Sequence, residues 1–129
     1  MGGCEKPVMK KRILIVEDEP SILELLRIVL TRQGYEVYTC STGRDAIATM
    51  KQVNPHLVIL DVMLPGLDGV GIVRIMSEDE ILSSTPVIVS SALLESEKLF
   101  SNYPQVKGFC AKPFVLKDFV IQIKQAIGD

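Results

Sequence analysis

Short runs of apolar residues alternate with segments of helical periodicity along the whole chain, and this alternation constrains the fold more than any other feature. The runs ILIV, LVIL and VIV are uninterrupted by polar residues, which is typical of strands covered on both faces. Strands that alternate with helices favour a parallel sheet, because parallel neighbours need crossover connections. We therefore predict an α/β fold, with helices on both faces of a five-stranded parallel sheet.

Five runs are predicted to be strands, because each is bounded by polar, glycine or proline residues. They are Arg12 to Val16, Glu36 to Cys40, Leu57 to Leu60, Pro86 to Ser90 and Gly108 to Ala111. Apolar residues recur at helical spacing between the strands; on the first helix they are Ile22, Leu25, Leu26, Val29 and Leu30. The part from Ala92 to Lys107 is the least regular, because Pro104 interrupts any long helix.

Residues suited to helix ends agree with this division of the chain. Proline is favoured in a first turn, small polar residues at an N-cap, and glycine or asparagine just past the end. The predicted end residues are Pro20 and Gly34 for the first helix, Ser41 or Thr42 and Asn54-Pro55 for the second, Asp68 at the start of the third, and Gly128 at the end of the last.

Composition narrows the class of protein. The 129 residues suit one domain, and 47% hydrophobic with 23% charged residues is typical of a globular protein. A net charge of -2 does not favour nucleic-acid binding, and no apolar run approaches the ~20 residues of a membrane span. Cys4, Cys40 and Cys110 are odd in number and widely spaced, which indicates reduced thiols and a cytoplasmic location.

Chemistry-bearing residues follow the strands at their carboxyl ends, where ligands of open α/β sheets gather. Glu17 and Asp18 follow the first strand, Asp61 the third, the Ser90-Ser91 pair the fourth, and Lys112 the fifth. No basic residue is near Asp61 in sequence. We therefore interpret its partners as a cation and a phosphoryl group rather than a protein side chain.

The motifs ILIVEDE, LVILDVMLPGLDG, PVIVSSA and GFCAKPF occur in one order and spacing from Arg12 to Ile127. Together they resemble the receiver domain of two-component response regulators. The resemblance implies a flavodoxin-like, doubly wound sheet of order 2-1-3-4-5, the order for which a receiver protein is a standard example. It divides the chain into residues 1–11, a tail or cloning remnant, and a receiver domain over residues 12–129.

By this resemblance Asp61 is the phosphoacceptor, since a carboxylate can attack a phosphoryl group. Glu17, through a water, and Asp18 are the acids that hold Mg²⁺, with Mn²⁺ as a substitute. Asp61 and the backbone carbonyl of Met63 complete the ligand set. Without the other motifs we would interpret Asp61 as the cap of the next turn, and the acids after the first strand as a solvated acidic turn that favours the positive end of a helix.

The same resemblance makes Lys112 the group that neutralises phosphoryl charge and Ser91 the hydroxyl that contacts it, with Ser90 as the competing position. Phe109 falls at the place of an aromatic switch residue, and core packing explains it equally well. The Lys112-Pro113 bond is expected to be cis. Without the other motifs, Lys112 would be read as a surface lysine.

Function and partners follow as expectations. The domain would accept a phosphoryl group from a sensor histidine kinase or a histidine phosphotransfer protein, without direct contact to nucleic acid or membrane. A homodimer formed on phosphorylation is a further expected partner. The chain is either a stand-alone regulator or, as we favour, a piece of a larger regulator or hybrid kinase. Because Met63 and Leu93 are apolar and cannot orient a water, the phosphorylated form is expected to lose phosphate slowly.

Three other functions compete with this reading. A phosphatase of the haloacid-dehalogenase type needs a second acid where Met63 stands. An FMN binder needs a hydroxyl- or glycine-rich loop where the chain has EDEP, which would repel a phosphate. The most serious alternative is a phosphorylation-independent pseudo-receiver that only docks partners.

Overall fold

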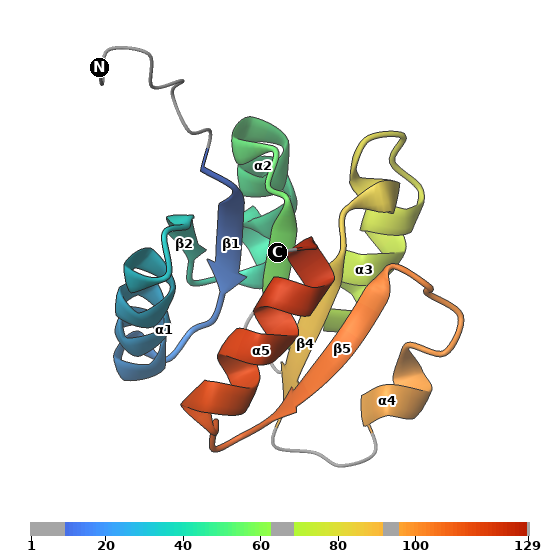
Figure 1. Cartoon of the computed structure of the whole chain (residues 1–129). Coiled ribbons are helices and arrows are strands. Elements are labelled where there is room, and N and C mark those ends of the chain that lie inside the picture. The colour runs from blue at the N-terminus through green and yellow to red at the C-terminus, as the bar shows by residue number, and fades with distance from the viewer. Residues whose placement is uncertain (1–9, 63–68, 92–95, 129) are drawn as a thin grey trace.

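The computed structural model describes residues 10–62, 69–91 and 96–128. Its centre is a five-stranded sheet in which all neighbours run parallel, in the order β2-β1-β3-β4-β5. This confirms the predicted doubly wound fold and its strand order (Figure 1). The strands are β1 (Arg12–Val16), β2 (Glu36–Cys40), β3 (Leu57–Asp61), β4 (Val87–Ser91) and β5 (Val106–Ala111).

The prediction for the fifth strand was wrong at its start. β5 begins at Val106, which pairs with Val87, and the register then shifts so that Ile88 pairs with Gly108. The ladder therefore extends back past Lys107 to Val106, two residues before the predicted start. The fourth strand lies one residue later than predicted, because pairing begins at Val87 and not at the preceding proline.

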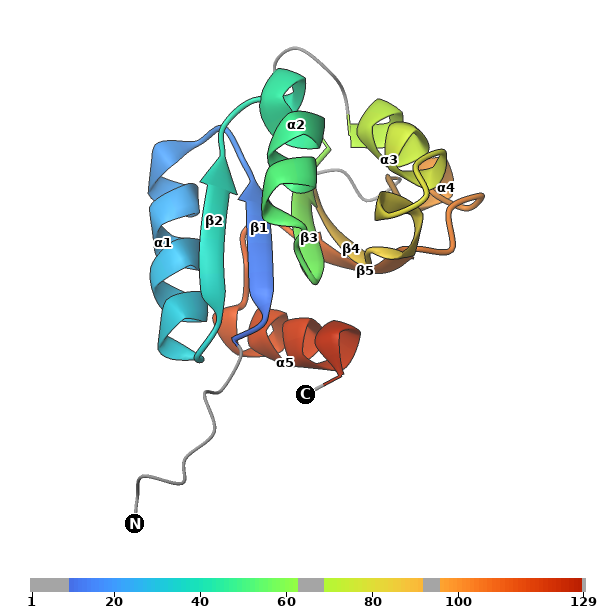
Figure 2. The same ribbon diagram turned by 90° about the horizontal axis from the view of Figure 1, so that it is seen from above.

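Helices cover both faces of the sheet, as Figure 2 shows. One core lies between the sheet and α1 and α5, and the other between the sheet and α2, α3 and the segment after α4. Strand residues alternate between the two cores, so every apolar residue of β1, β3 and β4 is buried on one side or the other. The helices are α1 (Pro20–Arg32), α2 (Gly43–Val53), α3 (Gly69–Ser77), η2 (Leu82–Ser84), α4 (Ser96–Leu99) and α5 (Leu116–Ile127).

The helix ends confirm most of the predicted boundaries. Thr42 is the N-cap of α2, and its hydroxyl accepts the backbone N–H of Asp45 at 3.3 Å. Asn54 ends the same helix in the left-handed conformation, with φ of 52°. Gly34 and Gly128 have φ of 95° and 90°, values at which a side chain would be strained. The predicted cap Asp68 lies outside the described residues.

The segment between α4 and β5 is irregular, as Pro104 predicted. α4 spans only Ser96–Leu99, and two turns close with the amides of Tyr103 and Val106 donating to carbonyls three residues back. Gln105 is buried, and its amide donates to the carbonyls of Leu82 and Thr85 at 3.1 and 2.9 Å. The segment is therefore held by polar contacts to the turn before β4 rather than by helical regularity.

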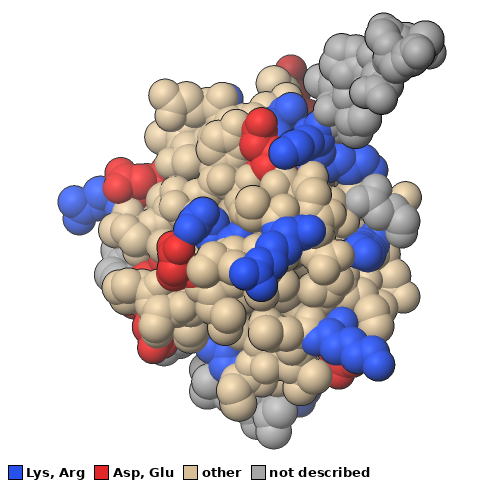
Figure 3. Space-filling view, turned by 60° about the vertical axis from the view of Figure 1, so that its left-hand side comes forward, with Lys and Arg blue, Asp and Glu red and all other residues tan. Residues whose placement is uncertain are grey.

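Within the described residues no helix is long and apolar enough to cross a bilayer, and the longest, α1, has 13 residues. Figure 3 shows one face of the molecule, on which several basic side chains lie together at the upper right, while others are separated by uncharged surface or lie beside acidic ones. Cys40 and Cys110 are buried free thiols, as expected of small core residues. His56 is exposed and accepts the backbone N–H of Arg12 at Nδ1.

Candidate functional site

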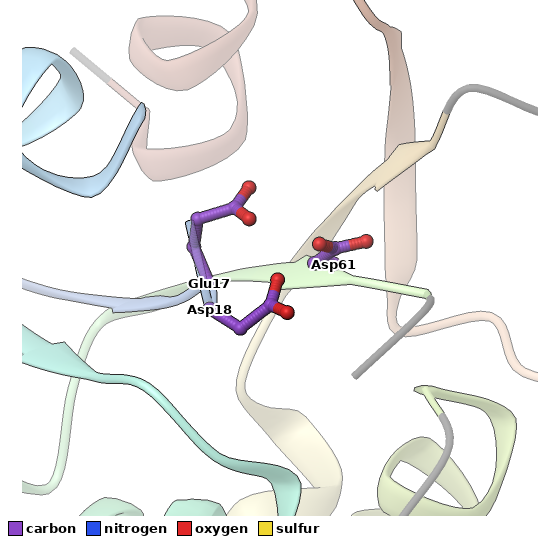
Figure 4. Close-up of side chains that lie close together, drawn as sticks. All are labelled: Glu17, Asp18 and Asp61. Atoms are coloured by element: carbon purple, nitrogen blue, oxygen red, sulfur yellow. The ribbon is translucent and has the colours of Figure 1, made fainter. Parts of the chain in front are cut away.

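Three carboxylates meet at the carboxyl ends of β1 and β3 (Figure 4). One ligand oxygen from each of Glu17, Asp18 and Asp61 lies within 4.8 Å of the others. Glu17 and Asp61 are buried, with only 2% and 4% of their surface exposed, whereas Asp18 is exposed. The predicted convergence of these acids is therefore present in the structure, although 43 positions separate Asp18 from Asp61.

The sheet register accounts for this convergence. Val16 pairs with Leu60, so the next residues along the two parallel strands, Glu17 and Asp61, emerge side by side. The ends are fixed by backbone hydrogen bonds, because the Glu17 amide donates to the Cys40 carbonyl at 3.0 Å. The residue after Asp61, Val62, donates its amide to Ser90 at 3.1 Å. Asp61 is consequently the last residue of a strand and Glu17 directly follows one, whereas Asp18 lies in the bend between β1 and α1.

Lys112 lies between the two buried acids. Its Nζ is 2.9 Å from Glu17 Oε1 and donates to Asp61 Oδ2 at 3.0 Å. The expectation that Asp61 has no partner from the protein was therefore wrong. The lysine is 51 positions away in sequence, and it reaches Asp61 because β5 ends at the same edge of the sheet.

The backbone holds Lys112 at this position. Its amide donates to the Ser91 carbonyl at 3.0 Å, which extends the β4–β5 pairing by one residue, and the bond to Pro113 is cis as predicted. With one ammonium between two buried carboxylates and Asp18 beside them, the four side chains carry a formal charge of -2 when ionised. The site is therefore poised to attract a cation.

Burial is the main cause that raises the pKa of Glu17, and the neighbouring Asp61 raises it further. Lys112 and the Glu19 amide, which donates to Oε2 at 3.2 Å, act in the opposite direction. Burial alone would lower the pKa of Lys112, but the two carboxylates outweigh it and raise that pKa. The lysine therefore stays charged, and Glu17 is the acid that is costly to ionise.

The donor set fits a hard divalent cation, which prefers carboxylate oxygens. Glu17 Oε1 is buried and, within the described part of the chain, accepts no hydrogen bond, its contact being the ion pair with Lys112. A buried oxygen of this kind has coordination capacity to spare. The predicted fourth ligand, the carbonyl of Met63, lies outside the described residues.

Both candidate hydroxyls lie at the end of β4 and are buried, with 2% of Ser90 and 6% of Ser91 exposed. The register pairs Asp61 with Ser90, and Ser91 is one residue further along the strand. Both serines therefore stay candidates for contact with a group on Asp61. The predicted choice of Ser91 depends on the family resemblance, and the register does not decide between them.

Phe109 lies on β5, on the face of the sheet that carries α2 and α3. Its ring is 6.1 Å from that of Phe100, centroid to centroid, at an interplanar angle of 54°. Such a tilted pair is a favourable aromatic contact. The side chain thus packs against the segment after α4, one residue before Cys110 and three before Lys112.

Comparison with known proteins gives the family. The model of the response regulator receiver domain matches residues 13–124. The chain belongs to this family. The DNA-binding response regulator MtrA of Mycolicibacterium smegmatis is 31% identical to this receiver domain over 117 residues, which are 90% of the chain and 50% of that protein. The chain thus spans about half the length of the curated relatives it matches.

Solved structures show the same fold. A putative response regulator from Chloroflexus aurantiacus J-10-fl has a TM-score of 0.86 at 24% identity, with 94% of this chain and 100% of that chain covered. The receiver domain of the sensor histidine kinase PA1611 from Pseudomonas aeruginosa PAO1, described with magnesium coordinated in its active-site cleft, has a TM-score of 0.83 at 24% identity, covering 94% and 100%.

Two residues with a place in this receiver site were not singled out from the sequence. Gly69 begins α3 so close to the end of β3 that a Cβ there would lie 2.9 Å from Val62 Cα and 3.3 Å from the Asp61 carbonyl oxygen. Gln122, on α5, contacts the backbone of β5 near Lys112. A glycine at a predicted helix start was a usable signal, whereas a glutamine on an amphipathic helix was not.

Proposed function

We propose that the protein is a phosphorylation-activated switch whose acceptor is Asp61. The observation that carries the proposal is the placement of Asp61 beside Lys112 and two further acids at the end of a buried strand. A structural aspartate has no need of this environment, whereas a phosphoryl acceptor needs cationic partners for the charge it gains. A phosphoryl group adds about 1.5–2 negative charges.

In the proposed transfer one Asp61 oxygen attacks the phosphorus of a phosphohistidine. The new O–P bond forms as the P–N bond breaks, and the electron pair remains on the imidazole, which takes up a proton from solvent. Lys112, at 3.0 Å from Asp61, is placed to neutralise the transferring oxygens. Ser91 is the proposed hydroxyl donor to the new phosphoryl group.

Asp18, Asp61 and the Met63 carbonyl are the proposed direct ligands of Mg²⁺, with Mn²⁺ as a substitute, and Glu17 is proposed to act through a water. When bound, the cation would neutralise phosphoryl charge and orient the group for in-line attack. Asp18 is exposed, so a cation held there would keep contact with solvent water. Glu17 is buried and forms an ion pair with Lys112, and this pair keeps the lysine beside Asp61.

Phosphorylation would change the contacts of Lys112 and Ser91. Phe109 is proposed to transmit this change to the surface of the domain. Its ring packs on Phe100, beyond α4. A shift at the end of β5 would therefore alter that face of the domain. A homodimer formed on phosphorylation is a proposed consequence.

The proposed partners are a sensor histidine kinase or a histidine phosphotransfer protein. Receiver domains of response regulators accept phosphoryl groups from histidine kinases, and this chain is a receiver domain over residues 12–129 in our proposal. The relatives named as DNA-binding regulators are about twice as long as this chain. We propose that the receiver part does not itself bind nucleic acid or a membrane, and that it acts in the cytoplasm.

A phosphorylation-independent docking module is the alternative. The presence together of Glu17, Asp18, Asp61 and Lys112 in one contact network counts against it. A module that only docks would have no requirement for buried acids around a lysine, because burying charges costs free energy unless they are used or well paired.

Intact-mass measurement after incubation with acetyl phosphate and Mg²⁺ tests the proposal. The wild type should gain one phosphoryl group, and Asp61→Asn should gain none. Glu80→Gln, which removes an exposed acid away from the site, is the matched control and should label as the wild type does. Equal labelling of the wild type and Asp61→Asn would refute the assignment of Asp61 as the phosphoacceptor. Absence of labelling when Mg²⁺ is left out would support the requirement for the metal.

A further inference from the structure

The seam between β5 and α5 is incompletely packed. Figure 1 shows α5 lying against one face of the sheet, beside β4 and β5. Two pockets open along this seam, one of about 310 Å³ beside Phe109 and Pro113 and one of about 300 Å³ beside Lys107 and Gly108. Gln122 lines both of them, so its side chain stands between two spaces that apolar packing does not fill.

Gln122 makes two hydrogen bonds to neighbouring residues of β5. Its Nε2 donates to the Phe109 carbonyl at 3.1 Å, and its Oε1 accepts from the Cys110 thiol at 2.7 Å. Both contacts require the same orientation of the side-chain amide, with Nε2 towards Phe109 and Oε1 towards Cys110. Burial raises the pKa of Cys110 to about 11, so the thiol keeps the proton that it donates.

The Phe109 carbonyl is a backbone group that the sheet leaves without a partner. β5 is an edge strand, and the Lys112 amide faces β4, where it donates to Ser91. In a parallel strand the backbone N–H and C=O groups of successive residues point to opposite sides. Those of Phe109, three residues before Lys112, therefore point to the open edge of the sheet. Gln122 therefore supplies the hydrogen bond that a sixth strand would otherwise make.

Glycine at 108 is matched to this contact. A Cβ on Gly108 would lie 3.0 Å from Gln122 Nε2 and 3.9 Å from Ile88 Cγ1. A side chain here would press on the amide that donates to Phe109. The strand is thus built to let the glutamine approach closely.

We propose that Gln122 is a positioning residue for phosphoryl transfer, which holds the end of β5 on α5 and thereby places the Lys112 ammonium between Glu17 and Asp61. The inference rests on the proposed function, because it concerns the same site. Gln122 touches none of the reacting groups in our assignment. It acts through the backbone, which runs from Phe109 to Lys112 in three residues.

Phosphorylation by acetyl phosphate with Mg²⁺, followed by intact mass over time, is the test. Gln122→Met removes both contacts at similar length, and Gln122→Glu keeps the acceptor for the thiol but loses the donor to Phe109. Gln125→Met, an exposed glutamine on the same helix, is the matched control. Both Gln122 variants lose the hydrogen bond to the Phe109 carbonyl, and we expect each to lose about five-fold in the maximal rate of labelling, which corresponds to one hydrogen bond. The concentration of acetyl phosphate that gives half of the maximal rate should stay unchanged. The control should match the wild type.

Amide hydrogen exchange gives a second readout that does not need phosphorylation. The Lys112 amide should exchange about five-fold faster in Gln122→Met and not in Gln125→Met, because the end of β5 opens more often. Unchanged rate and exchange in both Gln122 variants would overturn the proposal. So would a wild-type rate in Gln122→Glu, or losses that merely follow the thermal midpoint in all three variants. An unlabelled wild type would refute the proposed function instead, and the exchange would still decide the role of Gln122.

Discussion

Replacing Lys112 by methionine should destabilise the protein in a way that depends on pH. The change removes an ammonium that is 2.9 Å from Glu17 Oε1 and 3.0 Å from Asp61 Oδ2, and leaves a side chain of similar length. At an effective dielectric constant of about 20, each contact at ~3 Å corresponds to roughly 5 kcal/mol of Coulomb energy before desolvation is subtracted. The net effect must be smaller than that sum.

Breaking a buried pair by removing one partner costs about 3–5 kcal/mol. The lysine side chain is 18% exposed, so the lower end applies, and we expect a loss of about 3 kcal/mol in the free energy of unfolding near pH 7.5. Glu17 can relieve the strain by binding a proton. Its pKa is already raised, chiefly by burial, and loss of Lys112 removes a cause that lowers it.

The direction of the pH dependence follows from linkage. A folded-state pKa above the ordinary value of 4.5 means that the folded state binds more protons between the two pKa values, so stability falls as pH rises through that window. The penalty is complete above the folded pKa and absent below the unfolded one. Lys112→Met should therefore recover much of its lost stability as the pH is lowered towards about 5.

Urea unfolding followed by far-ultraviolet circular dichroism measures this, since the chain has no tryptophan. Lys117→Met, an exposed lysine on α5, is the control and should change stability by less than about 0.5 kcal/mol. Mg²⁺ should stabilise the Lys112 variant, by about 1.4 kcal/mol at ten times its dissociation constant. A loss below about 1 kcal/mol near pH 7.5, or one that is equal near pH 5, would refute this account of the cluster.

Three further predictions follow from other parts of the molecule. Gly69→Ala should lower the free energy of unfolding by about 1–3 kcal/mol in the same urea assay, because the new Cβ would lie 2.9 Å from Val62 Cα; an unchanged midpoint would show that α3 moves freely. Partial burial of the otherwise exposed His56 ring, together with the nearby charges of Arg12 and Lys11, lowers its pKa below the ordinary 6.5, so its contribution to stability is present above that pH and lost as the pH falls. His56→Gln should flatten the profile of thermal midpoint against pH in that range, and an unaltered slope would contradict this. Installing Asn at Met63 together with Glu at Leu93 should speed loss of the phosphoryl group by at least about ten-fold in an intact-mass time course, since both can orient a water; equal decay would refute the reason given for slow loss.

Local patterns were sufficient for most of the fold. Continuous apolar runs mark strands because a strand covered on both faces has no solvent side. Thr42 caps the start of a helix, and Asn54 and Gly128 cap the ends of helices, through contacts within a few residues. The start of β5 was missed because pairing past Lys107 depends on a register shift against β4, which no local preference announces. Strand ends are thus set partly by the neighbouring strand.

The amino-acid sequence by itself determined which chemical groups reach the carboxyl edge of the sheet, because strand order and residue order together place Glu17, Asp61 and Lys112 there. Only the tertiary structure decided how these groups pair. That Lys112 lies between the two buried acids, and that Gln122 holds the edge of β5, depends on register and side-chain direction across separate elements. Such contacts join residues far apart in the chain, and their energies depend on burial, which exists only once the layers have packed.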